Sequence, residues 1–141
     1  MSQDIKKKTV ENFINYSHQF LTALIGVWPT DKQLNAAKVK WDMLFSMGID
    51  DNIDEKKREL LDTWHTNLSP YYKNIFAGDI NFLKKIPNIM GINLYEKYSD
   101  QNIDNETRAA IVEYLQTITK EVQLFYTVKS VNNSTMDKIT N

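Results

Sequence analysis

Apolar residues recur at three- and four-residue intervals along most of the chain, which is the spacing of one face of an α-helix. Near the start they predict a helix over residues 3–26, stopped by Trp28-Pro29, whose buried stripe contains Val10, Phe13, Ile14, Phe20, Leu21, Leu24 and Ile25. Near the end they predict a helix over residues 105–129, with Ile111, Tyr114, Leu115, Ile118, Val122 and Phe125 in near-heptad order. Long helices are therefore expected at both ends of the chain.

Two further helices are expected between residue 30 and residue 68. A capping box at Thr30 and Gln33 would satisfy the first free N–H groups of one helix, and Gly48 would end it in a left-handed conformation. Its narrow apolar face is predicted from Leu34, Ala37, Trp41, Leu44 and Phe45. The next helix is expected to begin within residues 51–54 and to bury Leu60, Leu61, Trp64 and Leu68.

The centre of the chain predicts short elements. Ser69 and Pro70 fit an N-cap followed by proline at the first helical position, and Gly78 would end that helix. Asp79 can cap a second short helix carrying Ile80, Phe82, Leu83 and Ile86, which Pro87 interrupts. Residues 88–99 are expected to form one irregular or short helix. No run of strict apolar and polar alternation occurs, so strands should be at most a minor component.

These elements predict an all-α fold, a helical bundle with long first and last helices and short central helices. The two long helices should pack together as the scaffold, with the short helices capping one end. Residues 1–131 are expected to form a single helical domain, and residues 132–141 a flexible polar tail.

Composition narrows the possible function. The chain has 42% apolar and 25% charged residues, which is typical of a globular protein, and its longest apolar stretch is far shorter than the ~20 residues of a membrane span. The first residues lack the apolar core of a signal peptide, so we expect an intracellular rather than a secreted protein. The absence of cysteine excludes disulfides and thiolate zinc sites.

One repeated phrase raises the question of a calcium site. Asp-x-Asn-Ile-Asp occurs at residues 50–54 and again at residues 100–104, with oxygen-bearing side chains at alternate positions. An EF-hand loop also needs glycine at position six and glutamate at position twelve. Counted from Asp100, those positions hold Asn105 and Ile111, and the upstream copy fails in the same way. Helix capping is the better interpretation, with Asp104 as the cap of the last helix.

No catalytic or cofactor constellation is evident. His18 and His65 are the only histidines, and neither has a second histidine three or four residues away. The one carboxylate at that spacing is Asp62, three residues before His65, which is too few ligands for a local metal site. The nucleotide-binding glycine loops and the G-x-S-x-G motif are absent. We therefore predict that the protein is not an enzyme and that it needs no cofactor and no metal.

Two sets of side chains are candidates for partner contacts. Tyr71, Tyr72, Tyr95 and Tyr98 could form a protein-binding surface, because tyrosine is enriched at interfaces. Burial in the bundle is the alternative and is favoured by general preference. Lys6, Lys7, Lys8, Lys84 and Lys85, with Lys38 and Lys40, are candidate basic contacts for nucleic acid. Solvation is the simpler role for these lysines, since the net charge is −1 and the lysines are spread along the chain.

The segments YYKNIFAGDINFLKKIPNI and ETRAAIVEYLQTI resemble small helical proteins of nucleocytoplasmic large DNA viruses of algae and protists. They cover residues 71–89 and 106–118, in the C-terminal half, and Val112 stands where that pattern has tryptophan. Lysine greatly outnumbers arginine, with Arg58 and Arg108 as the only arginines. This bias indicates an AT-rich coding sequence, which agrees with the resemblance. The resemblance implies a viral protein, acting in the virion or the infected cytoplasm, and it assigns no site residue.

The resulting hypothesis is a non-catalytic α-helical interaction or assembly module, viral and virion-associated if the resemblance holds, which binds a protein partner or a second copy of itself. The alternative is a helical nucleic-acid-binding protein acting in viral replication or transcription.

Overall fold

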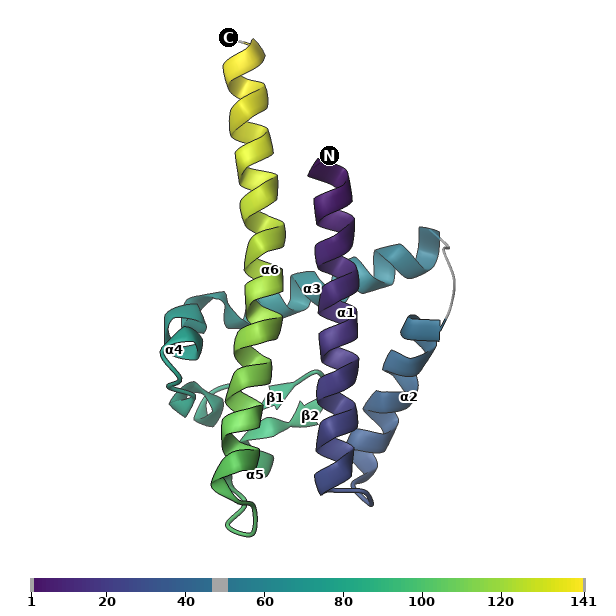
Figure 1. Ribbon diagram of the computed structural model, residues 1–141, viewed down its shortest axis with the longest axis vertical. Helices are drawn as coiled ribbons and strands as arrows, with labels where there is room; N and C mark the ends of the chain where they lie inside the picture. Colours follow the sequence, from purple (N-terminus) through teal and green to yellow (C-terminus); the bar gives the residue numbers. More distant parts are fainter. Residues whose placement is uncertain (1, 47–50, 141) are drawn as a thin grey trace.

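The computed structural model describes the backbone of residues 2–46 and 51–140 and the side chains of residues 5–44 and 54–128. Its two longest elements are α1 (Ser2–Val27) and α6 (Asn105–Thr140), which lie side by side and antiparallel (Figure 1). Lys6 lies over the ring of Phe125, and Phe20 stacks on Tyr114 with ring centroids 5.1 Å apart. The predicted scaffold of first and last helices is confirmed.

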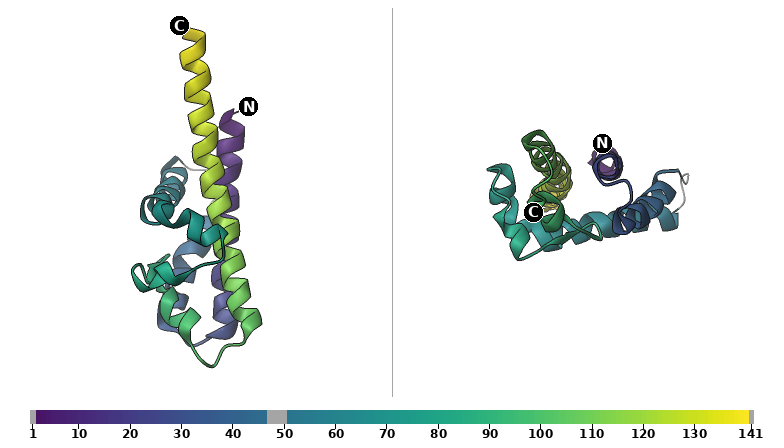
Figure 2. Two further views of the ribbon diagram at one scale, coloured as in Figure 1. Left: turned by 90° about the vertical axis from the view of Figure 1, so that its left-hand side faces the viewer. Right: turned by 90° about the horizontal axis from the view of Figure 1, so that it is seen from below.

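The remaining elements form a layer on one face of the α1–α6 pair (Figure 2). In chain order they are α2 (Lys32–Ser46), α3 (Asp51–Leu68), η1 (Ser69–Tyr71), α4 (Tyr72–Phe76), η2 (Asn81–Lys84), β1 (Asn88–Ile89), β2 (Ile92–Asn93) and α5 (Leu94–Ser99). The all-α fold class is therefore confirmed, apart from one small hairpin. The short central elements cover a face of the long helices rather than capping one end, so that part of the prediction is wrong.

The core lies between the α1–α6 pair and this layer. Phe13 of α1 meets Trp41 of α2 and Trp64 of α3 edge-on, with ring centroids 5.9 and 6.0 Å away. The indole N–H of Trp64 donates to the buried hydroxyl of Thr119, 3.2 Å away, and so joins α3 to α6. The predicted stripes supply most of this core, including Leu21, Leu24, Leu34, Leu61, Leu68, Ile111, Leu115, Ile118 and Val122.

The start of α2 differs from the predicted capping box. Asp31, not Thr30, is the cap, because its Oδ1 accepts the N–H of Leu34 at 2.9 Å. Gln33 instead accepts the N–H of Asn93 in β2, at 3.0 Å. Asp31 also binds Lys97 of α5, whose side chain is only 5% exposed. A tertiary ion pair thus fixes the helix start one residue later, and Gly48 falls outside the described residues.

The elements after α3 confirm some predicted signals and not others. Gly78 ends the short helix with a φ of 78°, as expected. Ser69 is the first residue of η1 rather than its N-cap, which is Leu68 without a side-chain cap. Asp79 does bind the start of η2, because its Oδ1 accepts the N–H of Asn81, the first residue of η2, at 3.1 Å. The short helix predicted over residues 70–77 is a 3₁₀ turn followed by α4.

The segment expected as one irregular or short helix contains an antiparallel hairpin followed by α5. Asn88 pairs with Asn93 and Ile89 with Ile92. Met90 and Gly91 form the turn between them, with φ values of 59° and 80°. Two positive values are typical of a type I′ turn, which usually carries asparagine or glycine first. The hairpin escaped prediction because two-residue strands show no alternation and methionine is no turn signal.

The last helix extends further than predicted. The predicted end is near residue 129, whereas α6 runs to Thr140. Residues 132–140 are therefore part of this helix. No glycine or proline lies between residues 105 and 140 to break it. The predicted start is confirmed, because Oδ1 of Asp104 accepts the N–H of Thr107 at 2.7 Å.

Candidate protein-interaction groove

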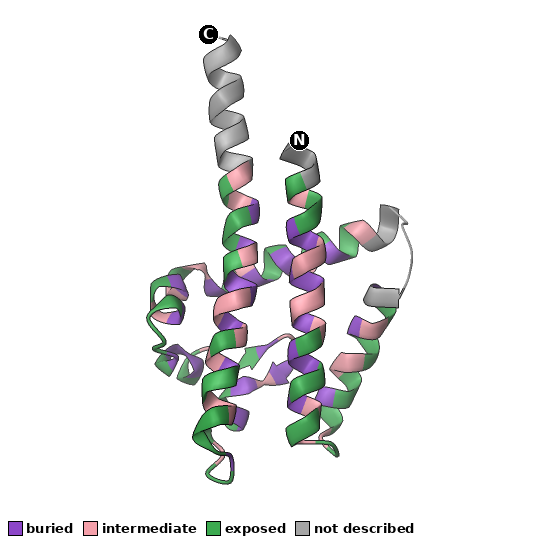
Figure 3. Ribbon diagram, in the orientation of Figure 1, coloured by how far each residue is buried: buried purple, intermediate pink, exposed green. Residues whose placement is uncertain are grey.

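The α1–α6 pair has a second face, turned away from the layer of shorter elements. In the views of Figures 1 and 2, none of the drawn elements covers it, and exposed and partly buried residues dominate it in Figure 3. Two adjoining cavities open along this face, and Ala110 and Tyr114 of α6 line both of them. We call this pair of cavities the α1–α6 groove.

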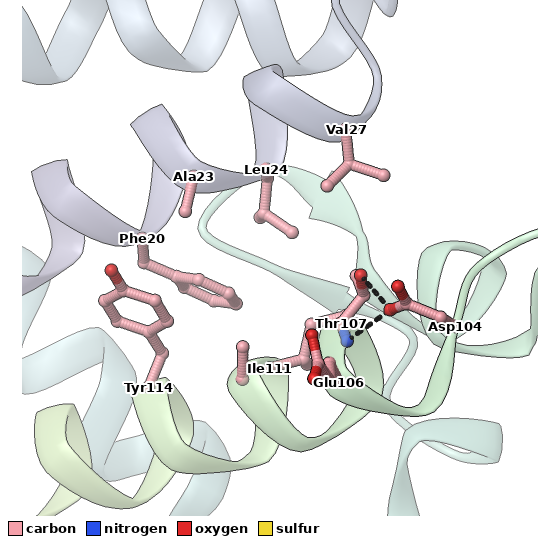
Figure 4. A pocket seen from close by; sticks show the side chains of 10 residues that line it. Phe20, Ala23, Leu24, Val27, Asp104, Glu106, Thr107, Ile111 and Tyr114 are labelled. Atoms are coloured by element: carbon pink, nitrogen blue, oxygen red, sulfur yellow. Dashed lines mark hydrogen bonds between the residues drawn. The ribbon is translucent and has the colours of Figure 1, made fainter.

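The first cavity has a volume of about 220 Å³ and lies between the end of α1 and the start of α6 (Figure 4). Its floor is apolar, because Phe20, Leu24 and Ile111 are each at most 2% exposed. Val27, 42% exposed, stands at one end, and Tyr114, stacked on Phe20, stands at the other. The complete lining is Phe20, Ala23, Leu24, Val27, Asp104, Glu106, Thr107, Ala110, Ile111 and Tyr114.

The second cavity has a volume of about 280 Å³ and continues the groove toward the middle of both helices. Its lining is more polar and consists of Tyr16, Gln19, Ala110, Glu113, Tyr114 and Thr117. Tyr16 and Tyr114 are partly buried and pack against the core, and both also line this cavity. This part of the groove offers aromatic surface next to a carboxylate.

Helix periodicity explains why these residues share one face. Tyr16, Ala23 and Val27 follow one another at seven- and four-residue steps along α1, and Ala110, Glu113 and Thr117 do so at three- and four-residue steps along α6. Each row flanks a buried stripe. Small side chains at Ala23 and Ala110 keep the groove open between the larger rings.

The rim of the groove is acidic. Hydrogen bonds from the hydroxyl and the N–H of Thr107 hold the pKa of Asp104 below its usual range, so this carboxylate is charged at neutral pH. Glu106 beside the first cavity and Glu113 beside the second are both exposed. Neither cavity has lysine or arginine among its described lining residues. The groove therefore combines the apolar floor of its first cavity with a lining whose only charged side chains, among the described residues, are acidic.

The four candidate tyrosines do not form the expected surface. Tyr72 is 9% exposed, and its hydroxyl bonds Nδ1 of His65 at 3.0 Å. Burial raises the pKa of Tyr72 well above its usual range. Tyr71 stacks on Phe82 and Tyr98 packs against the core, so Tyr95, 37% exposed, is the only one of the four classed as exposed. The alternative interpretation, burial in the bundle, accounts for most of this set.

The candidate lysines lie at separate places. Lys6, Lys7 and Lys8 are at the start of α1, whereas Lys84 and Lys85 are at η2, beside the opposite half of the bundle (Figure 1). Lys38 bonds Asp42 at 2.8 Å, and Lys40 is exposed on α2. The structure does not bring these seven candidate contacts together on one continuous surface.

The histidines meet partners that sequence spacing did not reveal. Nε2 of His18 bonds Asp42 of α2, and His65 stacks on Tyr126 with ring centroids 3.9 Å apart. Tyr126 in turn donates to Asp62. Across the described residues, no group of three histidine or acidic side chains is placed to hold a metal ion. The absence of a bound metal stays a prediction.

The repeated phrase at residues 100–104 is a helix approach. Asp100 accepts the N–H of Asn102 at 2.8 Å and the indole N–H of Trp28 at 3.1 Å. These hydrogen bonds lower the pKa of Asp100, with the Asn102 bond as the main cause. Arg108 donates to the carbonyl of Asp100 at 2.7 Å, which closes the loop against α6. The side chain of Ile103, within this loop, is buried. The copy at residues 50–53 falls outside the described side chains.

Sequence reasoning did not find the groove. Ala23, Val27, Ala110 and Glu113 carried no motif, and the flank of a helical stripe that becomes a groove depends on where the other helices pack. Ala23 and Val27, four residues apart on the first helix, were the available signal.

No helix in the described part of the chain is long and apolar enough to cross a membrane. Comparison with models of protein families, with curated proteins and with solved structures finds no match to this chain.

Proposed function

We propose that the protein is a non-catalytic helical interaction module that binds another protein in the α1–α6 groove. One observation carries this proposal: two adjoining cavities, the first with a buried apolar floor, open on an uncovered face between two antiparallel helices. Laying an amphipathic helix into such a groove is a recurring mode of peptide recognition. Tyr16 and Tyr114, which line the groove, are of a residue type enriched among interface hot spots.

The viral and virion-associated role forms part of this proposal and rests on the resemblance of residues 71–89 and 106–118. The second segment, residues 106–118, lies entirely in α6. Several of its residues line the groove, including Ala110, Ile111 and Tyr114. A virion component or infected-cell factor that recruits a partner through this helix fits both observations.

Site-specific photocrosslinking in the native source tests the proposal. A photoreactive residue replacing Gln19, which lines the second cavity, should yield a defined crosslinked protein, identified by mass spectrometry. The same group at Thr66, exposed on α3, is the positional control. Addition of Ala110→Arg should remove the crosslink by filling the groove, because Ala110 lines both cavities.

Ala109→Arg is the matched control variant. Ala109 is also exposed on α6 but lines neither cavity, so the crosslink should remain. Absence of a crosslinked protein at Gln19, or equal loss with both arginine variants, would contradict a groove-binding function.

A further inference from the structure

We propose that the occupant of the α1–α6 groove is a basic amphipathic helix of a partner protein, carrying one large apolar anchor and a lysine or arginine one to two turns away. This inference rests on the proposed function and names the partner's chemistry. It follows from the different linings of the two cavities and from the sign of the charges around them.

The first cavity selects the apolar anchor. Its volume is about 220 Å³, and its floor is formed by Phe20, Leu24 and Ile111. A dry cavity of about 150 Å³ with a similar lining is enough to hold benzene. One leucine- or phenylalanine-sized side chain therefore fits, with exposed Val27 as an additional apolar contact.

The second cavity selects a cation. Tyr16 and Tyr114 present aromatic surface for the methylene stem of a lysine or arginine, and Glu113 is placed for its charged head. The segments of α1 that line the two cavities have midpoints about six residues apart, which is about 9 Å along a helix. On a partner helix this distance falls between the i, i+4 and i, i+7 spacings, which lie on one face.

The charge pattern favours a partner protein over a second copy of this chain. Asp104, Glu106 and Glu113 border the groove, and no lysine or arginine is among its described lining residues. Two copies meeting through this face would bring like charges together, and such contacts cost several kcal/mol at interfaces. A basic helix instead gains attraction to these three carboxylates, which border both cavities.

Two synthetic 18-residue helices with the same leucine–alanine face provide the probes, one with lysine and the other with glutamate on its polar face. Binding is measured by fluorescence anisotropy at low salt, and its location by methyl NMR shifts of Ala23, Val27 and Ala110. We expect the lysine helix to bind and to shift these three signals. The glutamate helix should bind at least about tenfold more weakly.

Charge-reversal variants distinguish binding in the groove from general electrostatic attraction between the protein and the lysine helix. Glu106→Lys with Glu113→Lys should weaken the lysine helix at least about tenfold, whereas Glu55→Lys with Glu96→Lys, an equal change in net charge at exposed positions elsewhere, should change binding less than about twofold. Circular dichroism checks that both double variants remain folded.

Several outcomes would overturn the basic-helix proposal: binding of the glutamate helix in the groove, equal effects of the two double variants, lysine-helix shifts located elsewhere, or a groove-dependent dimer in sedimentation. If the Gln19 crosslink persists in any of these cases, the groove is an interaction site for a partner of different chemistry. Loss of that crosslink instead rejects the proposed function itself.

Discussion

Asp104 shows how a single carboxylate decides between a metal ligand and a helix cap. Its Oδ1 accepts both the N–H of Thr107 at 2.7 Å and the hydroxyl of Thr107 at 2.6 Å. One oxygen is therefore used to satisfy the first turn of α6, where a negative charge also favours the helix dipole. Asp100 and Asp104, whose spacing resembled that of calcium ligands, instead accept hydrogen bonds in the loop before α6 and in its first turn.

Asp104→Ala should therefore lower the melting temperature by a few degrees, because α6 loses its cap. The loss should be the same with calcium and with a chelator. Differential scanning calorimetry of both proteins in both buffers measures it. A calcium-induced rise in the melting temperature of the original protein, absent from the variant, would instead indicate a metal site.

A second residue-scale prediction concerns pH. The hydrogen bond from Lys97 and the N–H of Leu34 hold the pKa of Asp31 below its usual value of 3.8. A lowered folded-state pKa means that the stabilisation is complete above about pH 4 and is lost as the pH falls through the folded value. Asp31→Asn removes the charge and leaves Lys97 buried without its carboxylate.

We expect Asp31→Asn to lower the free energy of unfolding by about 2 kcal/mol at pH 7, since Asp31 is partly exposed and the full cost of a broken buried pair is reduced. Urea unfolding between pH 7 and pH 3 should show this difference shrinking below about pH 4. Glu96→Gln, at an exposed position of α5, is the control and should show no comparable difference. A difference that stays constant down to pH 3 would contradict the ion-pair explanation.

At the element scale, the hairpin and α1 respond oppositely to the same substitution. Gly91 has a φ of 80°, which side chains rarely adopt, while Gly26 lies in α1, and an added Cβ would meet no atom within 4 Å at either position. Gly91→Ala should therefore destabilise the protein by about 1 kcal/mol through backbone strain alone. Gly26→Ala should stabilise it by about 0.5 kcal/mol through helix propensity.

Chemical denaturation measures the change in the free energy of unfolding of each variant, which should be negative for Gly91→Ala and positive for Gly26→Ala. A loss of stability in both variants would indicate an effect of packing rather than of backbone conformation.

Element prediction succeeded where the signal is local and failed where a distant residue decides. The stripes of α1 and α6 were readable because burial recurs every three or four residues over many turns. The start of α2 was misplaced because Lys97, far away in sequence, binds Asp31 beside the expected cap. The hairpin was missed because its pairs, Asn88 with Asn93 and Ile89 with Ile92, are too few to leave a pattern.

For the whole molecule, the groove depends on which side of the α1–α6 pair the other helices occupy. Both flanks of the α1 stripe carry mixed polar residues, so sequence alone does not tell the covered flank from the open one. His18, on one flank, bonds Asp42 of α2, whereas Tyr16 and Ala23, on the other flank, line the groove. Fold class followed from the sequence, but the site follows from the packing.

Because the layer of shorter elements packs on the α1–α6 pair, the domain should unfold in one step. Leu115 lies in the first half of α6 and is fully buried, while Leu124, two and a half turns later on the same helix, is 43% exposed. Leu115→Ala should lower the free energy of unfolding by about 3 kcal/mol by leaving a cavity, and Leu124→Ala by less than about 0.5 kcal/mol. All three tryptophans report on this packing. Phe13 of α1 meets Trp41 and Trp64, and Thr119 of α6 bonds Trp64. Trp28, just after α1, donates to Asp100 in the loop before α6. Tryptophan fluorescence and circular dichroism should therefore give the same urea midpoint in the original protein and in both variants. Separate midpoints for the two signals in Leu115→Ala would show that the layer of shorter elements can persist after the long helices have separated.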